Sequence, residues 1–341
     1  MRVAIVVEGG LVEVIQATPL LRTIATGIED PHITLVGPPA AAGLLGSLPG
    51  ADSIVALRAL DGSRAASAAL AAAWREIRRR RFDTAVICSG RMLTRLLLYL
   101  TGIPRRIGSG GPDATTLLLS DYVRSRPGEN NAAAWLRLAG AMDVAFAFHQ
   151  PSFDPGPEAR ERAERELLGS GFEDGRLLVC VAPGHAWHEG PPAAAWEPER
   201  YAHLGNQLHA RHGAGVILVG EHEDRADVDR MLVDLEVPHL DLCGLLSLRE
   251  IAAVIERADL FVSGDSPLLH LAAALGTAAV GLFGPTDGRR RGPYGAVHRV
   301  VQAVDDRTPG DRARAMIGVD RSQLIAKIRV DDVLASIEAT L

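Results

Sequence analysis

The sequence predicts an α/β protein made of two doubly wound parallel-sheet domains that face each other across a cleft. Short apolar segments rich in Val and Ile alternate with longer segments of helical periodicity along nearly the whole chain. This alternation is typical of parallel strands covered by helices. Residues 149–157 interrupt it with a cluster of Pro and Gly, which indicates a linker, and the same alternation resumes afterwards.

In the first half, the apolar segments have the length of buried strands, and the segments between them have helical spacing. We expect strands at 2–7, 33–36, 54–57, 84–88 and 106–108, and helices at 19–26, 64–80, 91–100 and 131–142. Residues 108–131 are rich in Gly, Ser and Pro and are expected to form a long loop.

The second half repeats this organisation. We expect helices at 157–169, 198–212, 223–235 and 248–257, and strands at 177–182, 215–219 and 239–241. A chain of 341 residues has room for two domains of roughly 150 residues each. We therefore expect domains at 1–150 and 151–320, with 321–341 as an amphipathic C-terminal helix that packs back on the first domain.

Composition excludes several classes of function. A net charge of −6 argues against a nucleic-acid binder. The sequence contains no run of 18 uncharged apolar residues, so we expect no membrane span. Cys88, Cys180 and Cys243 stand far apart in apolar stretches, which predicts buried thiols in a reducing compartment. The histidines lack the spacing of a metal site, and residues 8–13 lack the Gly-x-Gly-x-x-Gly of dinucleotide binders. We expect no metal and no cofactor.

The segment 260–287 is the most informative part of the chain. Leu260-Phe261-Val262 indicates a buried strand, and after the turn Gly264-Asp265-Ser266 a helix begins at Pro267. Such a unit places the open N–H groups of a helix N-terminus at the carboxyl end of a parallel sheet, where phosphate binds well. We therefore predict a phosphate-bearing ligand beside Asp265 and His270.

Several motifs stand in one order along the chain. They are 11–19 (LVEVIQATP), 181–184 (VAPG), 196–201 (WEPERY), 219–223 (VGEHE), 242–248 (LCGLLSL), 265–270 (DSPLLH) and 284–287 (GPTD). In order and spacing the chain resembles glycosyltransferase family 9, the ADP-heptose:lipopolysaccharide heptosyltransferases.

The resemblance implies a GT-B fold with two Rossmann-like domains. It also implies that the protein transfers heptose from ADP-heptose to a hydroxyl of a saccharide acceptor such as lipopolysaccharide core. This transfer would invert the configuration of the sugar and would need no metal ion. The second domain would bind the nucleotide-sugar donor, and the first the saccharide or lipid-linked saccharide acceptor. The expected location is the cytoplasm, with peripheral contact at the inner membrane.

The resemblance also assigns donor-binding residues, position by position, in the second domain. These are Gly184, His185, Glu221, Leu246, Ser247, Asp265, Ser266, Leu268, His270, Gly284 and Thr286. In these donor-binding motifs the chain departs from the family pattern at three positions: Pro267 stands for a Gly, Ala194 for a Lys, and His185-Ala186 supply no hydroxyl. Arg289, Arg290 and Arg291 are possible substitutes for the missing cation, because Arg suits phosphate oxygens.

Glu13 is the expected catalytic base, which would take the proton of the acceptor hydroxyl. The family has Gly-Asp where this chain has Val12-Glu13. The longer Glu side chain moves the carboxylate by ~1.5 Å, and a misplacement of that size can cost about 100-fold in rate.

Simpler interpretations remain open at most of these positions. Asp265 or Ser266 could serve as a helix N-cap, and Ser247 with Glu250 forms the pattern of a capping box. Glu13 could be a plain carboxylate at the first strand–helix turn. The basic run Arg75 and Arg78–Arg81 could lie on a solvated face, or it could meet anionic lipid or a phosphorylated acceptor.

Alternative functions also remain open. They are a non-catalytic sugar-nucleotide-binding homologue, a transferase with a soluble secondary-metabolite acceptor, and a sugar-nucleotide epimerase.

Overall fold

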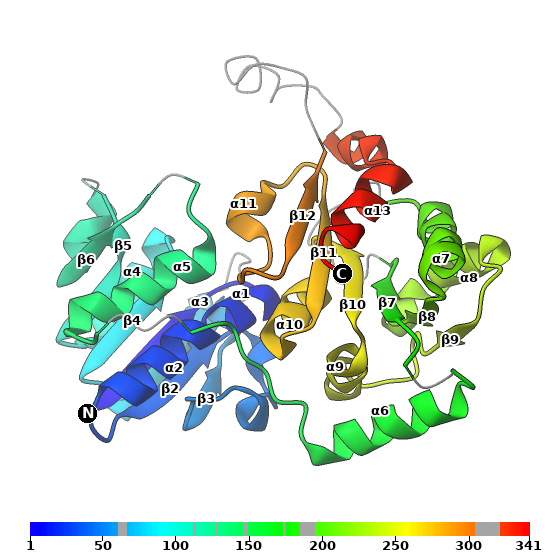
Figure 1. Cartoon of the computed structure of the whole chain (residues 1–341). Helices are drawn as coiled ribbons and strands as arrows, with labels where there is room; N and C mark the ends of the chain where they lie inside the picture. Colours follow the sequence, from blue (N-terminus) through cyan, green and yellow to red (C-terminus); the bar gives the residue numbers. More distant parts are fainter. Residues whose placement is uncertain are drawn as a thin grey trace. The chain divides into compact units, whose positions relative to one another are not determined.

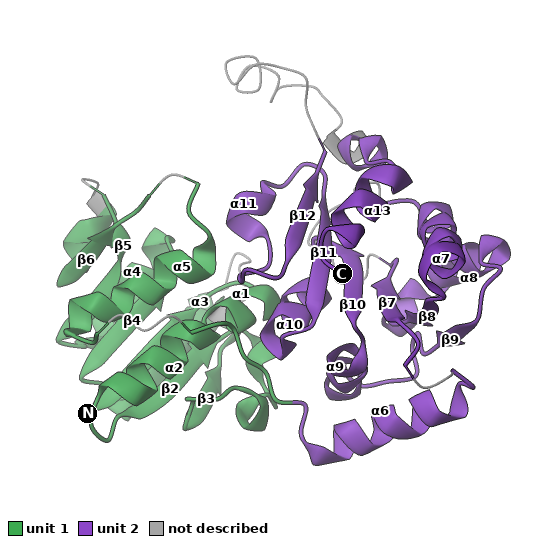
Figure 2. Ribbon diagram, in the orientation of Figure 1, with its two compact units in different colours: residues 1–154 green, residues 155–341 purple. Residues whose placement is uncertain are grey.

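The computed structural model describes residues 1–60, 67–111, 114–126, 128–145, 149–172, 175–184, 195–303 and 321–341. These residues divide into two compact units, Met1–Asp154 and Pro155–Leu341 (Figure 2). Within the described residues, each unit contains one parallel sheet of six strands flanked by helices. The predicted α/β class with doubly wound sheets is therefore confirmed for each unit.

The first sheet has the strand order β3-β2-β1-β4-β5-β6, and each adjacent pair is parallel. Its strands are β1 (Arg2–Val7), β2 (His32–Gly37), β3 (Ser53–Ala56), β4 (Thr84–Cys88), β5 (Arg105–Gly110) and β6 (Asp121–Arg124). Strand β1 lies between β2 and β4, so its apolar residues 3–7 are fully buried.

The helices of the first unit form two contacting groups, α1 and α5 with α2, and α3 with α4 (Figure 1). Right-handed crossovers place such groups on opposite faces of a parallel sheet. The helices are α1 (Leu11–Gln16), α2 (Thr18–Gly27), α3 (Ser67–Arg80), α4 (Met92–Thr101) and α5 (Asn131–Leu136), and the 3-10 turns are η1 (Pro39–Ala41), η2 (Leu45–Ser47), η3 (Arg58–Leu60), η4 (Ala114–Leu118) and η5 (Arg137–Met142).

The second sheet has the order β12-β11-β10-β7-β8-β9, again with parallel neighbours. Its strands are β7 (Leu178–Ala182), β8 (Gly215–Leu218), β9 (His239–Asp241), β10 (Leu260–Gly264), β11 (Ala278–Phe283) and β12 (Arg299–Gln302). In both sheets the chain starts in the middle, winds to one edge, and returns to the middle before winding to the other edge, which is the doubly wound topology.

The helices of the second unit also form two groups, α6 and α10 with α9, and α8 and α13 with α7. They are α6 (Pro157–Gly169), α7 (Pro198–His212), η7 (His222–Asp224), α8 (Arg225–Asp234), α9 (Leu248–Arg257), α10 (Pro267–Leu275), α11 (Gly288–Arg291), η8 (Arg321–Lys327) and α13 (Val330–Glu338). Val333, Leu334 and Ile337 of α13 are buried in the core of this unit. The C-terminal segment is thus part of the second unit's own packing.

Some elements differ from the predictions. Strand β6 and turn η4 lie inside the predicted loop 108–131, and β12 and α11 were not expected. The edge strand β6 has the polar sequence Asp121-Tyr122-Val123-Arg124, which carries little strand signal, and its pairing with β5 is what orders it. The predicted helix 131–142 ends as α-helix at Leu136 and continues as η5.

The three cysteines are buried free thiols, as predicted. Burial raises the pKa of Cys88 and Cys180, and raises the pKa of Cys243 to about 11. All three side chains are therefore protonated at neutral pH and are poor nucleophiles.

Candidate functional site

The candidate site lies at the carboxyl edge of the second sheet, beside the point where the winding direction reverses. Strands β7 and β10 are neighbours there, yet the chain leaves them toward opposite edges. Pro183-Gly184 follows β7 and Asp265-Ser266 follows β10. Ligands of open α/β sheets bind at such a switch point.

Helix α10 has its N-terminus at this edge, and Ser266 caps it. The Ser266 hydroxyl accepts a hydrogen bond from the Leu269 N–H at 3.4 Å and lies 3.1 Å from the Ser263 hydroxyl. The capping interpretation is thus correct for Ser266 rather than for Asp265. The side chain of Leu268 is fully buried, which leaves only its backbone to meet a ligand.

Asp265 pairs with Arg291, the last residue of α11. The Arg291 Nε lies 3.5 Å from the Asp265 carboxylate, and the two side chains are 30% and 16% exposed. Arg289 instead bonds Asp287, the N-cap of its own short helix, and is 82% exposed. Arg291 therefore reaches the candidate site, whereas Arg289 pairs outside it.

His270, on the first turn of α10, is buried. Its burial, together with the nearby charges of Arg291 and His298, lowers its pKa to about 3. The imidazole is therefore neutral at physiological pH and acts as a hydrogen-bonding group rather than as a cation.

His298 is a neighbour of His270 that the sequence analysis missed. It is 8% exposed, and neither of its ring nitrogens has a hydrogen-bond partner within the described part of the chain. Burial, with a contribution from Arg299, lowers its pKa to about 4. No local signal marks His298, because 28 residues separate it from His270 and the fold of α11 and β12 brings them together.

An acidic cluster follows strand β8. The buried Asp224 carboxylate accepts a hydrogen bond from the Glu221 N–H at 3.0 Å. A Cβ on Gly184 would clash with this carboxylate, so glycine at 184 leaves the space that Asp224 occupies. Burial, then Glu223 and Asp224, raises the pKa of Glu221. Carboxylates in such a cluster suit the hydroxyl groups of a ribose.

The other donor-site candidates have clear structural roles. Ser247 and Glu250 form the predicted capping box of α9: the Glu250 carboxylate accepts from the Ser247 N–H at 2.8 Å and from its hydroxyl at 2.7 Å. Leu246 precedes this cap and is half-buried. Gly284 packs on Ile325, where a Cβ would lie 2.9 Å from the Ile325 Cβ. The Gly284 carbonyl accepts a hydrogen bond from the Gln302 amide at 2.9 Å, which orders the turn.

Two further positions complete the predicted donor set. Thr286 lies in the turn after Gly284 and is half-buried. His185 and the departure at Ala194 fall outside the described residues.

Glu13 is held by its own helix. Its Oε2 accepts a hydrogen bond from the Gly10 N–H at 2.9 Å. Gly9 has φ +127°, and a Cβ there would lie 2.7 Å from the Glu13 carboxylate. Val12 is buried in helix α1, so this position has no need of a glycine. The Glu13 carboxylate is half-buried at the carboxyl edge of the first sheet.

Glu8 is a second carboxylate at that edge, which the sequence analysis missed. Its side chain is 5% exposed and accepts hydrogen bonds from Arg91 and Thr94, both at 2.7 Å, and from Ser89. It follows β1 and its partners follow β4, so this cluster lies at the switch point of the first sheet. The signal was an acidic residue directly after a buried strand.

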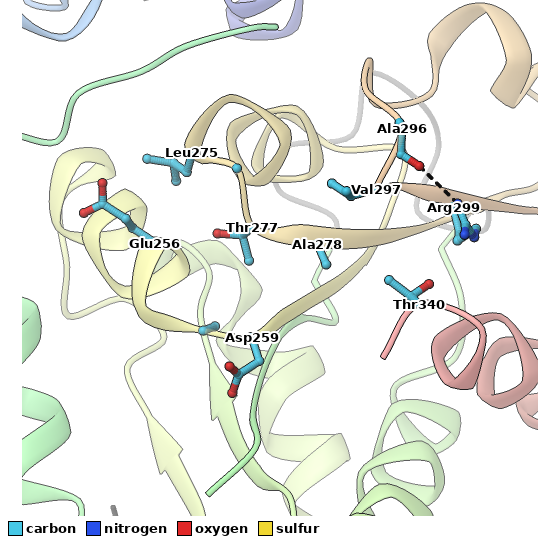
Figure 3. A pocket seen from close by; sticks show the side chains of 11 residues that line it. Glu256, Asp259, Leu275, Thr277, Ala278, Ala296, Val297, Arg299 and Thr340 are labelled. Atoms are coloured by element: carbon cyan, nitrogen blue, oxygen red, sulfur yellow. Dashed lines mark hydrogen bonds between the residues drawn. The ribbon is translucent and has the colours of Figure 1, made fainter. Parts of the chain in front are cut away.

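A separate cavity of about 460 Å³ lies at the opposite, amino edge of the second sheet (Figure 3). Asp259, Thr277 and Arg299 line it near the starts of β10, β11 and β12. It contains none of the predicted donor residues. Its lining is mixed in character and indicates no particular ligand.

Two doubly wound units, with a helix N-terminus, an arginine and a neutral histidine at the switch point of the second, place the chain in the doubly wound class of α/β proteins, whose ligands bind at that point. The model of glycosyltransferase family 9 (heptosyltransferase) matches residues 70–315. The chain therefore belongs to this glycosyltransferase family.

Curated relatives agree with this assignment. Lipopolysaccharide heptosyltransferase 2 of Salmonella typhimurium is 27% identical over 248 residues, which are 67% of each chain. Lipopolysaccharide heptosyltransferase 3 of Escherichia coli K12 is 33% identical over 129 residues, 37% of this chain and 36% of the relative.

Solved structures show the same fold. A family 9 glycosyltransferase from Veillonella parvula has a TM-score of 0.83 at 21% identity, covering 99% of this chain and 96% of its own. E. coli ADP-heptose heptosyltransferase II has a TM-score of 0.74 at 20% identity, covering 100% and 98%. The GT-B prediction is thereby confirmed.

The fold is shared beyond the transferases. UDP-GlcNAc 2-epimerase from Methanocaldococcus jannaschii has a TM-score of 0.52 at 12% identity, covering 96% of this chain and 91% of its own. The fold alone therefore does not distinguish a glycosyltransferase from a sugar-nucleotide epimerase.

None of the helices in the described ranges has the length and apolar character needed to cross a membrane. Over the same ranges, no three His, Cys, Asp or Glu side chains are grouped so that they could hold a metal ion.

Proposed function

We propose that the second unit binds a nucleotide-diphosphate sugar, ADP-heptose, with its diphosphate at the N-terminus of α10. The observation that carries the proposal is the Asp265–Arg291 pair beside the buried, neutral His270 at this helix end. The open N–H groups and Arg291 together supply positive charge and donors, which suit a diphosphate. The acidic cluster around Glu221 would accept the ribose hydroxyls.

In the proposed reaction, Glu13 removes the proton of an acceptor hydroxyl as that oxygen attacks the anomeric carbon of the sugar. The diphosphate leaves from the opposite face, so the configuration inverts. Arg291 and the α10 N-terminus, in place of a metal ion, stabilise the negative charge on the departing diphosphate. The hydrogen bond from the Gly10 N–H uses only the Oε2 atom of the Glu13 carboxylate, so the second carboxylate oxygen can still accept a proton or a hydrogen bond.

The proposed acceptor is a saccharide of the lipopolysaccharide core, reached on the cytoplasmic side of the inner membrane. The free thiols of the chain suit the reducing cytoplasm. The nucleotide sugar is a substrate, and the proposal requires no further cofactor. The second candidate is a binding protein without transferase activity, which the Val12-Glu13 departure and the Glu13–Gly10 bond favour.

Titration calorimetry with ADP, UDP and GDP tests the donor site. We expect ADP to bind most tightly, and Arg291→Ala to weaken it about tenfold or more, because a hydrogen bond to a charged group is lost. Asp265→Ala should also weaken it. Arg289→Ala is the matched control, since Arg289 pairs with Asp287 instead. Equal losses for the two Arg variants, or no ADP binding at all, would contradict the site.

Transfer of heptose from ADP-heptose to a core saccharide tests the reaction itself. Glu13→Gln should preserve ADP binding and lower the transfer rate by about 100-fold or more, because the general base is lost. Donor binding without transfer in the unmodified chain would favour the binding-protein alternative. Conversion of the donor without any acceptor would favour an epimerase.

A further inference from the structure

Gln302, the last residue of the edge strand β12, makes three hydrogen bonds to the turn that follows β11. Its Nε2 group donates to the carbonyls of Phe283 at 3.0 Å and Gly284 at 2.9 Å. Its Oε1 accepts a hydrogen bond from the Gly288 N–H at 2.9 Å. Both kinds of group in the amide, its N–H donors and its carbonyl oxygen, are thus bonded. Gln302 therefore ties the two ends of the turn 284–288 to the sheet.

The same turn carries α11, the helix that ends at Arg291. Gly288 is the first residue of α11, and a Cβ there would overlap the side chain of Val300 on β12. Val300 and Gln302 are two residues apart on one strand, so their side chains lie on the same face of the sheet. Helix α11 is therefore seated directly on β12, where Val300 packs against it and Gln302 bonds its first N–H (Figure 1).

Helix α10 lies on this same face of the sheet. A Cβ on Gly281 of β11 would lie 2.6 Å from the Leu269 side chain of α10 and 2.7 Å from the Phe283 ring. The Phe283 ring also lies 3.0 Å from the position that a Cβ on Gly288 would take. The two parts of the proposed diphosphate site, the N-terminus of α10 and Arg291 of α11, therefore lie on one face of the neighbouring strands β11 and β12.

Helix α11 is too short to fix its own position. Its four residues form a single turn, which is marginal without tertiary contacts. Asp287 caps it by accepting a hydrogen bond from the Arg289 N–H at 3.0 Å, but this bond lies within the turn and moves with it. The bonds of Gln302 instead join the turn to the sheet. They help to determine where Arg291 stands relative to Asp265, whose carboxylate lies 3.5 Å from the Arg291 Nε.

We propose that Gln302 is a positioning residue for the donor site, which holds α11 in place before the ligand arrives and so sets Arg291 to meet a diphosphate. A side chain that is fixed beforehand loses less conformational freedom on binding, which raises the affinity. Gln302 acts through Arg291, and it thereby favours a nucleoside diphosphate over a monophosphate. The inference rests on the proposed function, because it requires Arg291 to bind the diphosphate.

Titration calorimetry of the full chain with ADP and AMP tests the proposal. Gln302→Met keeps the length of the side chain but removes all three hydrogen bonds. We expect ADP binding to weaken about tenfold and AMP binding about twofold or less, because AMP has one phosphate fewer to meet Arg291. Adding Arg291→Ala should cause no further loss, since both changes remove the same contact. Gln207→Met is the matched control, because the Gln207 amide bonds His203 on the surface of α7.

Hydrogen exchange without any nucleotide measures the positioning itself. In Gln302→Met, the peptide that covers residues 284–292 should exchange about tenfold faster than in the unmodified chain, because the Gly288 N–H has lost its acceptor. Peptides from β7, β8 and α7 should exchange at unchanged rates, which shows that the variant is folded.

Three results would overturn the proposal. They are unchanged exchange at residues 284–292, equal losses of ADP and AMP affinity, and additive losses in the double variant. Failure of the donor site itself gives a different result: the unmodified chain would bind no ADP, or Arg291→Ala would bind it as tightly as the unmodified chain. Either result refutes the role of Gln302 in binding as well, whereas faster exchange at 284–292 would still show that Gln302 holds α11.

Discussion

His270 and His298 are imidazoles that the second unit holds neutral by burial. Their pKa values in the folded chain, about 3 and about 4, lie below the ordinary 6.5. The charges that face them are Arg291 for His270 and Arg299 for His298, and each opposes protonation further. A neutral imidazole near Arg291 can accept or donate a hydrogen bond, and the positive charge of the proposed diphosphate site then comes from Arg291.

These values predict how stability depends on pH. Between pH 6.5 and about 4 the unfolded chain binds protons at both histidines that the folded chain does not. The free energy of unfolding therefore falls as the pH falls through this window, by about 1 kcal/mol or more per pH unit. Urea unfolding at pH 7, 6 and 5 measures it.

The variant that checks the cause is His298→Phe, which keeps an aromatic ring but removes one titrating group. It should flatten the pH dependence, whatever its effect on stability at pH 7. His203→Phe, on the exposed side of α7, is the control and should keep the slope of the unmodified chain. A His298→Phe slope equal to that of the control would rule out His298 as a source.

At the scale of elements, the site depends on close packing between turns that follow different strands. Gly184 after β7 leaves room for Asp224 of η7, which follows β8. Gly284 after β11 leaves room for Ile325 of η8. Small residues at these turns let the carboxyl ends of neighbouring strands approach one another.

Gly184→Ala tests this packing. The new methyl would displace the Asp224 carboxylate, so we expect a loss of about 1–3 kcal/mol in the free energy of unfolding. Gly169→Ala at the end of α6 meets no atom within 4 Å and should be neutral or stabilising by about 0.5–1 kcal/mol. Urea unfolding of both variants measures the difference, and equal stabilities would show that Asp224 moves at no cost.

At the scale of the whole molecule, the chain is two units with separate cores. Proteins of this kind need not unfold in one step. A ligand that binds only one folded unit stabilises that unit by mass action, by about 2.7 kcal/mol at a concentration of 100 times Kd.

We expect ADP to raise the unfolding temperature of the second unit and to leave the first unit's transition in place. Differential scanning calorimetry with and without ADP measures this, and hydrogen exchange of peptides from residues 1–154 and 155–341 assigns each transition to a unit. If ADP shifted only the transition of residues 1–154, the donor site would lie in the first unit instead.

Local sequence patterns were enough to predict much of the fold and part of the candidate site. The strand–turn–helix unit around Ser266 and the capping box of Ser247 and Glu250 depend on residues within a few positions of one another, so sequence suffices to find them. The order of the motifs was enough to identify family 9, which the family model then confirmed.

The sequence by itself determined the alternation of strands and helices, the helix caps and the family, because these depend on near neighbours or on the order of motifs. Only the tertiary structure decided which arginine reaches Asp265, that His298 lies near His270, and that Glu8 is bound by Ser89, Arg91 and Thr94. The edge strands β6 and β12 are likewise features that only the tertiary structure revealed. The physical reason is that these contacts join residues distant in sequence, and their energies depend on burial and on strand pairing that no local pattern encodes.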